Sequence, residues 1–121
     1  MENTKLLGRW GEEQAAAYLK KKRWKIVGLN YTSRFGEIDL IAENKEFIAF
    51  VEVKTRKSDV YAQAREFVTK SKQTRILSTA QLWLQSNPSD KQLRFDVIEV
   101  YAPEGMKTRS PEVHHIENAF M

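Results

Sequence analysis

The segment from Phe47 to Arg56 constrains the fold of this chain more than any other. It begins with five consecutive apolar residues, Phe47 to Val51, and continues through Glu52 and Lys54. An apolar run of this length is far too short to cross a membrane, and it indicates a central strand that is covered on both faces. We therefore expect neighbouring strands on both sides of this segment and helices above and below it.

Hydrophobic periodicity and turn residues place the other elements. The predicted helices span 6–22 and 71–85, with Ser71 as the N-cap of the second, and a short helix is expected around 64–68. The predicted strands span 24–31, 37–43, 46–56, 93–101 and, as a short edge strand, 113–116. This order predicts an α/β fold in which a strand meander and a helical crossover build a mixed central β-sheet flanked by helices.

Composition limits the chemistry that the chain can perform. Its 121 residues fit one domain, 1–121, and they include no cysteine, which excludes disulfides, a thiolate nucleophile and Cys-ligated zinc. Residues 1–25 carry charge throughout and show no signal-peptide core, so we expect a soluble, cytoplasmic protein with no membrane partner. The net charge of +4 is weak support for a polyanionic partner.

Two carboxylates lie on the arms of the hairpin predicted around residues 44–45. Counting outward from that turn puts Asp39 and Glu52 on one face with an offset of two positions, roughly 7–8 Å apart at the backbone. Lys54 shares the face of Glu52, roughly 6.6 Å further along the strand. One interpretation is local: Glu52 and Lys54 form an ion pair, and Asp39 caps or pairs nearby. The other is that the two carboxylates converge on a site.

Converging carboxylates favour a divalent cation. Two of them at this spacing repel each other by about 1–4 kcal/mol, which a bound cation would relieve. Oxygen ligands without cysteine indicate Mg²⁺ or Mn²⁺ rather than zinc. The adjacent His114 and His115 face opposite sides of their strand and cannot share one metal. Asp96 is expected either to pair with Arg94 or to support the site without being catalytic.

Basic residues offer contacts to phosphate. Lys72 either lays its stem along the apolar stripe of its helix or contacts a phosphate beside the helix N-terminus. The segment 20–25, which includes Lys22, holds five cations in six positions. It is either a solvated helix end or a patch that contacts backbone phosphates. Arg34 and Arg56 extend such a patch if they share its face.

Several of these residues belong to an ordered set of segments that resembles a known family. The set is Gly8-x-x-Gly11-Glu12, Asn30, Gly36-Glu37-Ile38-Asp39-Leu40-Ile41, Phe50-Val51-Glu52-Val53-Lys54-Thr55-Arg56, Lys72, Arg94-Phe95-Asp96-Val97 and Asn118-Ala119-Phe120. Asp39 followed by Glu52-x-Lys54 resembles the PD-(D/E)XK nuclease superfamily, with Ile38 in place of its proline. The whole chain resembles the small bacterial YraN-like family of endonuclease-like proteins, relatives of archaeal Holliday junction resolvases.

The resemblance implies a restriction-endonuclease-like αβββαβ core with a metal-dependent site. Asp39, Glu52 and Glu12 would hold Mg²⁺ or Mn²⁺, with help from the backbone carbonyl of Val53. Lys54 would orient or activate the attacking water and stabilise charge at the scissile phosphate. The same resemblance favours a phosphate contact for Lys72.

We therefore expect a Mg²⁺- or Mn²⁺-dependent endonuclease that hydrolyses DNA phosphodiester bonds, with branched or otherwise structured DNA as the substrate class. Its catalytic residues would be Glu12, Asp39, Glu52 and Lys54, and its nucleic-acid contacts Lys72, Arg56, Arg34 and Lys22. A homodimer is expected by analogy with the resolvases. The alternatives are a non-catalytic nucleic-acid-binding module on a nuclease fold and a scaffold in a larger assembly.

Overall fold

The computed structural model describes residues 3–57 and 68–120, and it contains two long helices and five strands in that part of the chain. The helices are α1 (Thr4–Lys21) and α2 (Lys70–Ser86). The strands are β1 (Lys25–Ser33), β2 (Gly36–Glu43), β3 (Phe47–Arg56), β4 (Gln92–Tyr101) and β5 (Glu112–Ile116), and a 3₁₀ turn, η2, covers Gly105–Lys107. Most of the short helix predicted around 64–68 lies outside the described residues.

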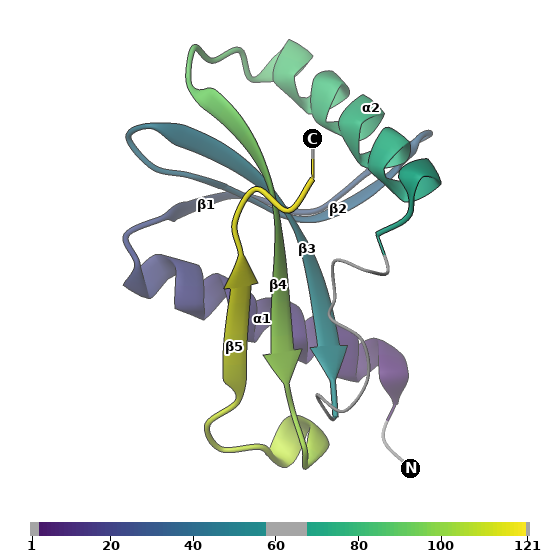
Figure 1. The fold of residues 1–121 in the computed structure, drawn as a ribbon, viewed down its shortest axis with the longest axis vertical. Coiled ribbons are helices and arrows are strands. Elements are labelled where there is room, and N and C mark those ends of the chain that lie inside the picture. The colour runs from purple at the N-terminus through teal and green to yellow at the C-terminus, as the bar shows by residue number, and fades with distance from the viewer. Residues whose placement is uncertain (1–2, 58–67, 121) are drawn as a thin grey trace.

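The strands form one mixed sheet in the order β1-β2-β3-β4-β5 (Figure 1). β1, β2 and β3 make an antiparallel meander, α2 carries the chain across to β4, and β4 runs parallel to β3 over its full length. β5 returns antiparallel to β4 as an edge strand. The predicted α/β class, with a mixed sheet flanked by helices, is confirmed, and the element order is compatible with a restriction-endonuclease-like core.

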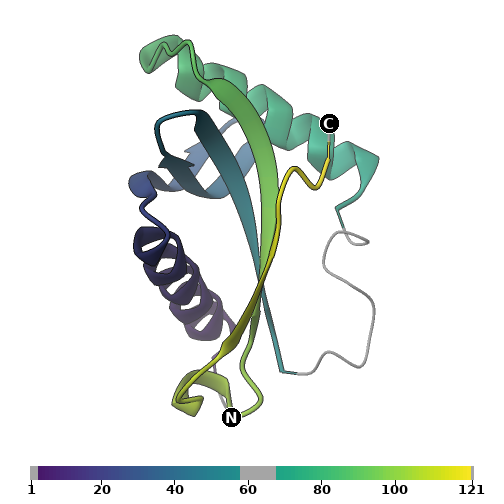
Figure 2. The same ribbon diagram turned by 60° about the vertical axis from the view of Figure 1, so that its left-hand side comes forward.

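β3 lies in the middle of the sheet, and α1 and α2 cover opposite faces of it (Figure 2). Its apolar run supplies both cores: Ile48 and Phe50 pack on the α2 side, whereas Ala49 and Val51 pack on the α1 side. The prediction of a strand covered on both faces is confirmed. Neither described helix is long and apolar enough to cross a bilayer.

The start of α2 differs from the prediction. Thr69, not Ser71, is the N-cap, and its hydroxyl oxygen accepts a hydrogen bond of 3.1 Å from the backbone N–H of Lys72. Ser and Thr are both favoured N-caps, with Ser ranked above Thr, so residue type pointed to Ser71. The earlier start makes Lys72 the third residue of the helix rather than the first.

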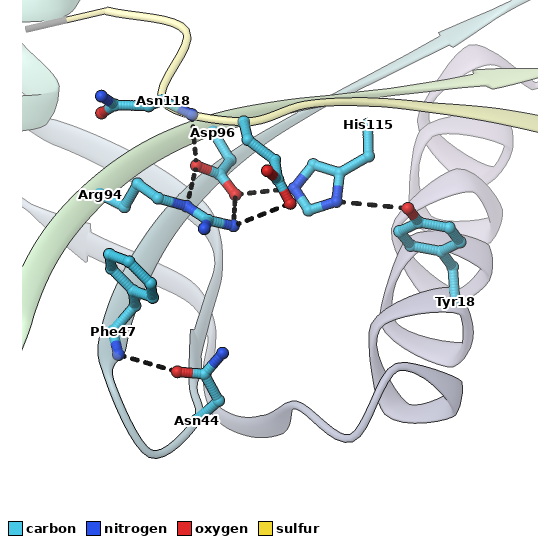
Figure 3. A network of polar contacts seen from close by, with 8 residues as sticks. Tyr18, Asn44, Phe47, Arg94, Asp96, His115 and Asn118 are labelled. Atoms are coloured by element: carbon cyan, nitrogen blue, oxygen red, sulfur yellow. Dashed lines mark hydrogen bonds and ion pairs between the residues drawn. The ribbon is translucent and has the colours of Figure 1, made fainter.

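A buried carboxylate on the α1 side ties the C-terminal part of the chain to the sheet (Figure 3). Asp96 is fully buried, and it accepts hydrogen bonds of 3.0 and 2.9 Å from the guanidinium of Arg94 and of 2.9 Å from the backbone N–H of Asn118. His115 Nε2 lies 2.7 Å from Asp96 Oδ2, and the His115 Nδ1 atom lies 3.3 Å from the Tyr18 hydroxyl. The predicted Arg94–Asp96 pair is confirmed, and the network joins α1, β4, β5 and the tail.

Burial alone would raise the pKa of Asp96, but the hydrogen bonds from His115, Arg94 and Asn118 outweigh it and hold that pKa below its ordinary value. The tail that follows crosses to the other face, where Phe120 packs against Phe95 at a ring distance of 5.4 Å. Asp96 is therefore a structural anchor, and its place among the recognised segments has a physical explanation that does not involve catalysis.

Gly11 sets how closely α1 approaches β3. A Cβ atom at this position would lie 1.8 Å from the Thr55 hydroxyl oxygen, so the helix and the strand come too near for any other residue. Gly8, one turn earlier on the same helix, has open space where its Cβ would be. The close contact at Gly11 brings the following residue, Glu12, to the end of β3 that carries Glu52 and Lys54.

The two glycines make a matched pair for a stability test. We expect Gly11→Ala to lower the free energy of unfolding by about 1–3 kcal/mol because the methyl group forces α1 off β3. Gly8→Ala should raise it by up to about 1 kcal/mol, since alanine is the better helix former. Urea unfolding followed by circular dichroism measures both. Equal stability of the two variants would contradict the close packing.

Candidate active site

The site lies where β2 and β3 separate. The paired register of the two strands runs from Glu43↔Ile48 to Leu40↔Val51 and stops there. Continued by one residue, it puts Asp39 level with Glu52, so the two carboxylates stand at the point of divergence, which we call the fork. The backbone groups of the strands no longer pair with each other beyond this point, and they are available to side chains.

The predicted offset of two positions between Asp39 and Glu52 is wrong, and the turn explains why. Asn44 closes the hairpin with its side chain, whose oxygen accepts a hydrogen bond of 2.9 Å from the N–H of Glu46. The same oxygen accepts a hydrogen bond of 2.8 Å from the N–H of Phe47 (Figure 3). The observed register therefore centres between Lys45 and Glu46 rather than between residues 44 and 45. This shift of one residue moves the pairing partner of every β2 residue by two and removes the offset of two.

Asp39 is held by the backbone at the fork. Its Oδ2 accepts a hydrogen bond of 2.8 Å from the N–H of Val53, which the separation of the strands has released. Burial, and after it the negative charge of Glu52, raise the pKa of Asp39 to about 7, while the Val53 N–H opposes the rise. Glu12 and Glu37 also raise it. Asp39 therefore stands among other carboxylates and is held by a backbone N–H, while the lysines at the fork contact Glu52.

Glu52 is buried, with 7% of its surface exposed, and it holds two lysines. Lys72 Nζ lies 2.5 Å from Glu52 Oε1, and Lys54 Nζ lies 3.5 Å from the same oxygen. The predicted ion pair between Glu52 and Lys54 is confirmed. The shorter contact to Glu52 comes from Lys72, which belongs to α2. Two ammonium groups thus share one carboxylate oxygen.

The two lysines respond differently to this arrangement. Burial lowers the pKa of Lys54, and the neighbouring ammonium of Lys72 adds to the effect, against the opposing charge of Glu52. Burial also lowers the pKa of Lys72, but its hydrogen bond to Glu52 and the charge of that group outweigh burial and raise the pKa above its ordinary value. Lys72 is therefore the tighter partner of Glu52, and Lys54 is the lysine that loses its proton more readily.

Glu12 reaches the site from α1. Its Oε1 accepts a hydrogen bond of 2.9 Å from the side-chain amide of Asn30, a β1 residue in the left-handed conformation with φ of 47°. Asparagine tolerates this conformation better than most residues, which accounts for its presence in the strand. The contact between α1 and β1 fixes Glu12 within electrostatic range of Asp39, so four elements contribute to the acidic site.

Two clefts meet at the fork. The α2 cleft, about 450 Å³, lies between the fork and the first turns of α2 and is lined by Gly36, Glu37, Asp39, Glu52, Thr69, Ser71, Lys72, Arg75 and Ile76. The α1 cleft, about 320 Å³, is lined by Thr4, Leu7, Gly8, Glu12, Asp39, Glu52, Val53, Lys54 and Thr55. Asp39 and Glu52 belong to both, so a ligand in either cleft contacts the same two carboxylates.

The donors at the fork match a hard divalent cation in their chemistry. Glu12, Asp39 and Glu52 offer carboxylate oxygens, which Mg²⁺ and Mn²⁺ prefer, and burial together with the charge of Glu52 raises the pKa of Asp39. Within residues 3–57 and 68–120, however, no three acidic or histidine side chains already stand together as a complete metal-binding group. The ligand set predicted from the sequence stays a prediction.

The residues predicted to contact nucleic acid are spread over the surface. Lys72 lines the α2 cleft, and Arg56 lies further along β3, where its Nε is 3.5 Å from Glu99 Oε2. Arg34 stacks on Phe35 in the β1–β2 turn, with 4.9 Å from guanidinium to ring centre. Lys22 follows the far end of α1, roughly 15 Å of helix rise beyond Glu12. Lys72 is the member of this set that joins the site directly.

Glu37 and Glu99 were not predicted as site or buried charged residues from the sequence. Glu37 lines the α2 cleft and adds to the negative charge on Asp39, and the alternation of Gly36-Glu37-Ile38-Asp39 was a usable signal for it. Glu99 is 2% exposed in β4 and accepts a hydrogen bond of 2.8 Å from the Tyr101 hydroxyl. A glutamate within a nearly continuous apolar strand marked it as a group that needs buried partners.

The fold and the site define a class: a mixed α/β protein with acidic groups and two lysines at the point where two central strands part. Comparison with known sequences places the chain in a family. A family model described as uncharacterised protein family UPF0102 matches residues 11–100. The chain belongs to this family, which is the YraN-like family that its segments resemble.

Relatives from several bacteria cover nearly the whole chain. The UPF0102 protein of Caldanaerobacter subterraneus is 48% identical over 120 residues, which are 98% of this chain and 97% of the relative. That of Alkaliphilus oremlandii is 44% identical over 119 residues, 96% of this chain and 98% of the relative. That of Syntrophomonas wolfei is 42% identical over 115 residues, 94% and 96% respectively. The similarity thus includes all the elements that build the site.

The raised pKa of Asp39 predicts a pH-dependent stability. Between about pH 4 and 7 the unfolded chain releases the Asp39 proton while the folded chain keeps it, so wild type loses stability as the pH rises through this range. Asp39→Asn keeps an acceptor for the Val53 N–H and removes the charge. It should therefore stabilise the protein by about 1–3 kcal/mol at pH 8 and by much less at pH 4.5.

Urea unfolding of both proteins in EDTA at the two pH values measures the difference. A gain that is equal at pH 4.5 and pH 8 would show that Asp39 is not under electrostatic strain.

Proposed function

We propose that this protein is a metal-dependent endonuclease that hydrolyses phosphodiester bonds of DNA, on a PD-(D/E)XK nuclease core related to the Holliday junction resolvases. One observation carries the proposal: the fork puts Asp39 and Glu52 side by side at the end of a buried strand, with Lys54 on the same carboxylate. Burying like charges together is unfavourable unless a cation or a substrate balances them. The two lysines at the fork contact Glu52, which leaves Asp39 as the carboxylate whose charge a metal would balance.

The residues at the fork would have different roles in phosphodiester hydrolysis. Asp39, Glu52 and Glu12 would hold Mg²⁺ or Mn²⁺, and the metal would neutralise phosphate charge and lower the pKa of a bound water. Asp39 is kept in place by the Val53 N–H, and Glu12 by Asn30. Lys54, whose lowered pKa makes it the readier proton donor and acceptor, would orient the attacking water and stabilise charge at the phosphate.

The charge of the surroundings favours a nucleic-acid substrate. Neutralising the three acidic groups raises the net charge of the chain from +4 to +7. Lys72 and Arg75 line the α2 cleft, and Arg56 and Arg34 lie further out, where they would contact backbone phosphates without reading sequence. Branched or otherwise structured DNA in the cytoplasm is the substrate that we propose, with two copies of the chain acting on the two strands.

A non-catalytic nucleic-acid-binding module is the second candidate, and one observation favours it. Lys72 already neutralises Glu52, and within the described ranges no complete metal-binding group is assembled. A module of this kind would bind DNA in a salt-dependent manner and would not respond to divalent metal. Titration with Mn²⁺ therefore separates the two candidates.

Cleavage assays test the proposal. Single-stranded, duplex, flap and four-way-junction DNA are incubated with the protein in Mg²⁺ or Mn²⁺. We expect metal-dependent cleavage of at least one of them, and a loss of about 100-fold or more in Asp39→Asn and Glu52→Gln. Lys54→Ala should lose about as much through the lost positive charge.

Lys45→Ala is the matched control for Lys54→Ala, because it also removes one lysine charge, from the exposed turn at the far end of the same hairpin. It should cut like wild type. Cleavage that is equal in wild type and Asp39→Asn, or absent on all four substrates with both metals, would contradict the proposal.

A further inference from the structure

Lys72 occupies a position that the proposed function assigns to another cation. Its ammonium lies 2.5 Å from Glu52 Oε1, closer than the 3.5 Å of Lys54. It comes from a different element than the acidic residues, since α2 contributes Lys72 to the cleft that Asp39 and Glu52 also line. The contact therefore spans the α2 cleft and places a positive charge of the protein itself on a predicted metal ligand.

The local charges make this contact conditional. Lys72 and Lys54 are near enough for each to influence the pKa of the other, so two ammonium groups share one carboxylate. Like charges at this distance repel, and only the surrounding negative charge offsets the repulsion. A divalent cation at Glu52 would add two further positive charges beside Lys72. The ammonium and the metal therefore compete for the same oxygen.

The α2 cleft offers the Lys72 ammonium a second position, away from Glu52. Lys72 has a four-carbon flexible stem, and 36% of its side chain is exposed, so its end can swing without moving the helix. Ser71 and Arg75 line the same cleft on either side of it in the sequence. A phosphate group in this cleft would meet the hydroxyl, the guanidinium and the ammonium together, and all three suit an anionic oxygen.

We propose that Lys72 is an exchangeable cation, which balances Glu52 in the absence of metal and moves to a phosphate of the substrate when a divalent metal binds. The α2 cleft is then a phosphate subsite next to the metal site, and Lys72 connects the two. The proposal rests on the proposed function, because it takes the fork to be a metal site. It goes further by stating how metal and substrate depend on each other.

A thermodynamic consequence follows. When a phosphate draws Lys72 away from Glu52, the metal loses its competitor, and when the metal displaces Lys72, the phosphate gains a partner. Metal and phosphate must therefore strengthen each other's binding by the same factor. Without metal the protein keeps Glu52 paired with Lys72, and it assembles the active arrangement only when both ligands are present.

Mn²⁺ binding measured by the loss of its free EPR signal tests this without relying on activity. Thymidine 3′,5′-bisphosphate serves as the phosphate probe, and a protein-free titration corrects for Mn²⁺ bound by the nucleotide. Lys72→Met should bind Mn²⁺ about tenfold more tightly than wild type, because the competing charge is gone. Lys70→Met removes an exposed lysine of the same helical turn and should bind Mn²⁺ like wild type.

The nucleotide should tighten Mn²⁺ binding several-fold in wild type and clearly less in Lys72→Met, where only the direct attraction between metal and phosphate remains. Lys72→Arg keeps the charge and should retain most of the coupling. Thermal unfolding checks that each variant is folded at the temperature of the titration. If Lys72→Met is unfolded there, Lys72→Arg still allows the coupling to be measured.

Mn²⁺ affinity in Lys72→Met equal to or weaker than in wild type, or an equally large effect of the nucleotide in both proteins, would overturn the exchange. If those results come with metal-dependent cleavage by wild type, the proposed function stands and the exchange alone fails. Absence of Mn²⁺ binding in wild type and in all variants would overturn both.

Discussion

The structure of the site depends on the separation of β2 and β3 immediately after the Leu40↔Val51 pair. Where the two strands pair, their facing backbone groups form the hydrogen bonds of the sheet and their side chains pack in the two cores. Where they part, the N–H of Val53 becomes available to Asp39, and Asp39 and Glu52 come to stand level just beyond the last β2–β3 pair. The apolar run of β3 is buried in both cores and fixes the position of the two carboxylates.

The surroundings of Asp96 and of Asp39 shift the pKa of the carboxyl group in opposite directions. Asp96 on the α1 side receives donors from Arg94, His115 and Asn118, and its pKa falls below the ordinary value despite full burial. Asp39 at the fork receives one backbone donor and faces other carboxylates, and its pKa rises to about 7. The first arrangement is complete and stabilises the fold. The second places Asp39 beside other carboxylates, while the two lysines at the fork contact Glu52.

Sequence patterns predicted the features that depend on residues close together in the chain. The apolar run and the helical and strand periodicities gave the element order and the mixed sheet, and adjacency along the chain gave the Arg94–Asp96 pair and the contact of Glu52 with Lys54. They failed where a single side chain decides the geometry. The Asn44 side chain recentres the hairpin and so changes the register, and Thr69 moves the start of α2. The contact of Lys72 with Glu52 joins residues 20 positions apart, and no periodicity reports it.

The proposed divalent-cation site at the fork can be tested directly with a crystal structure of the protein grown or soaked with Mn²⁺, because the anomalous scattering of manganese locates the ion independently of any assumption about activity. We expect an anomalous peak within coordination distance of Asp39 and Glu52 oxygens, roughly 2–2.5 Å, with Lys72 turned away from Glu52. Crystals at saturating Mn²⁺ that show no peak at the fork and Lys72 still bound to Glu52 would contradict it.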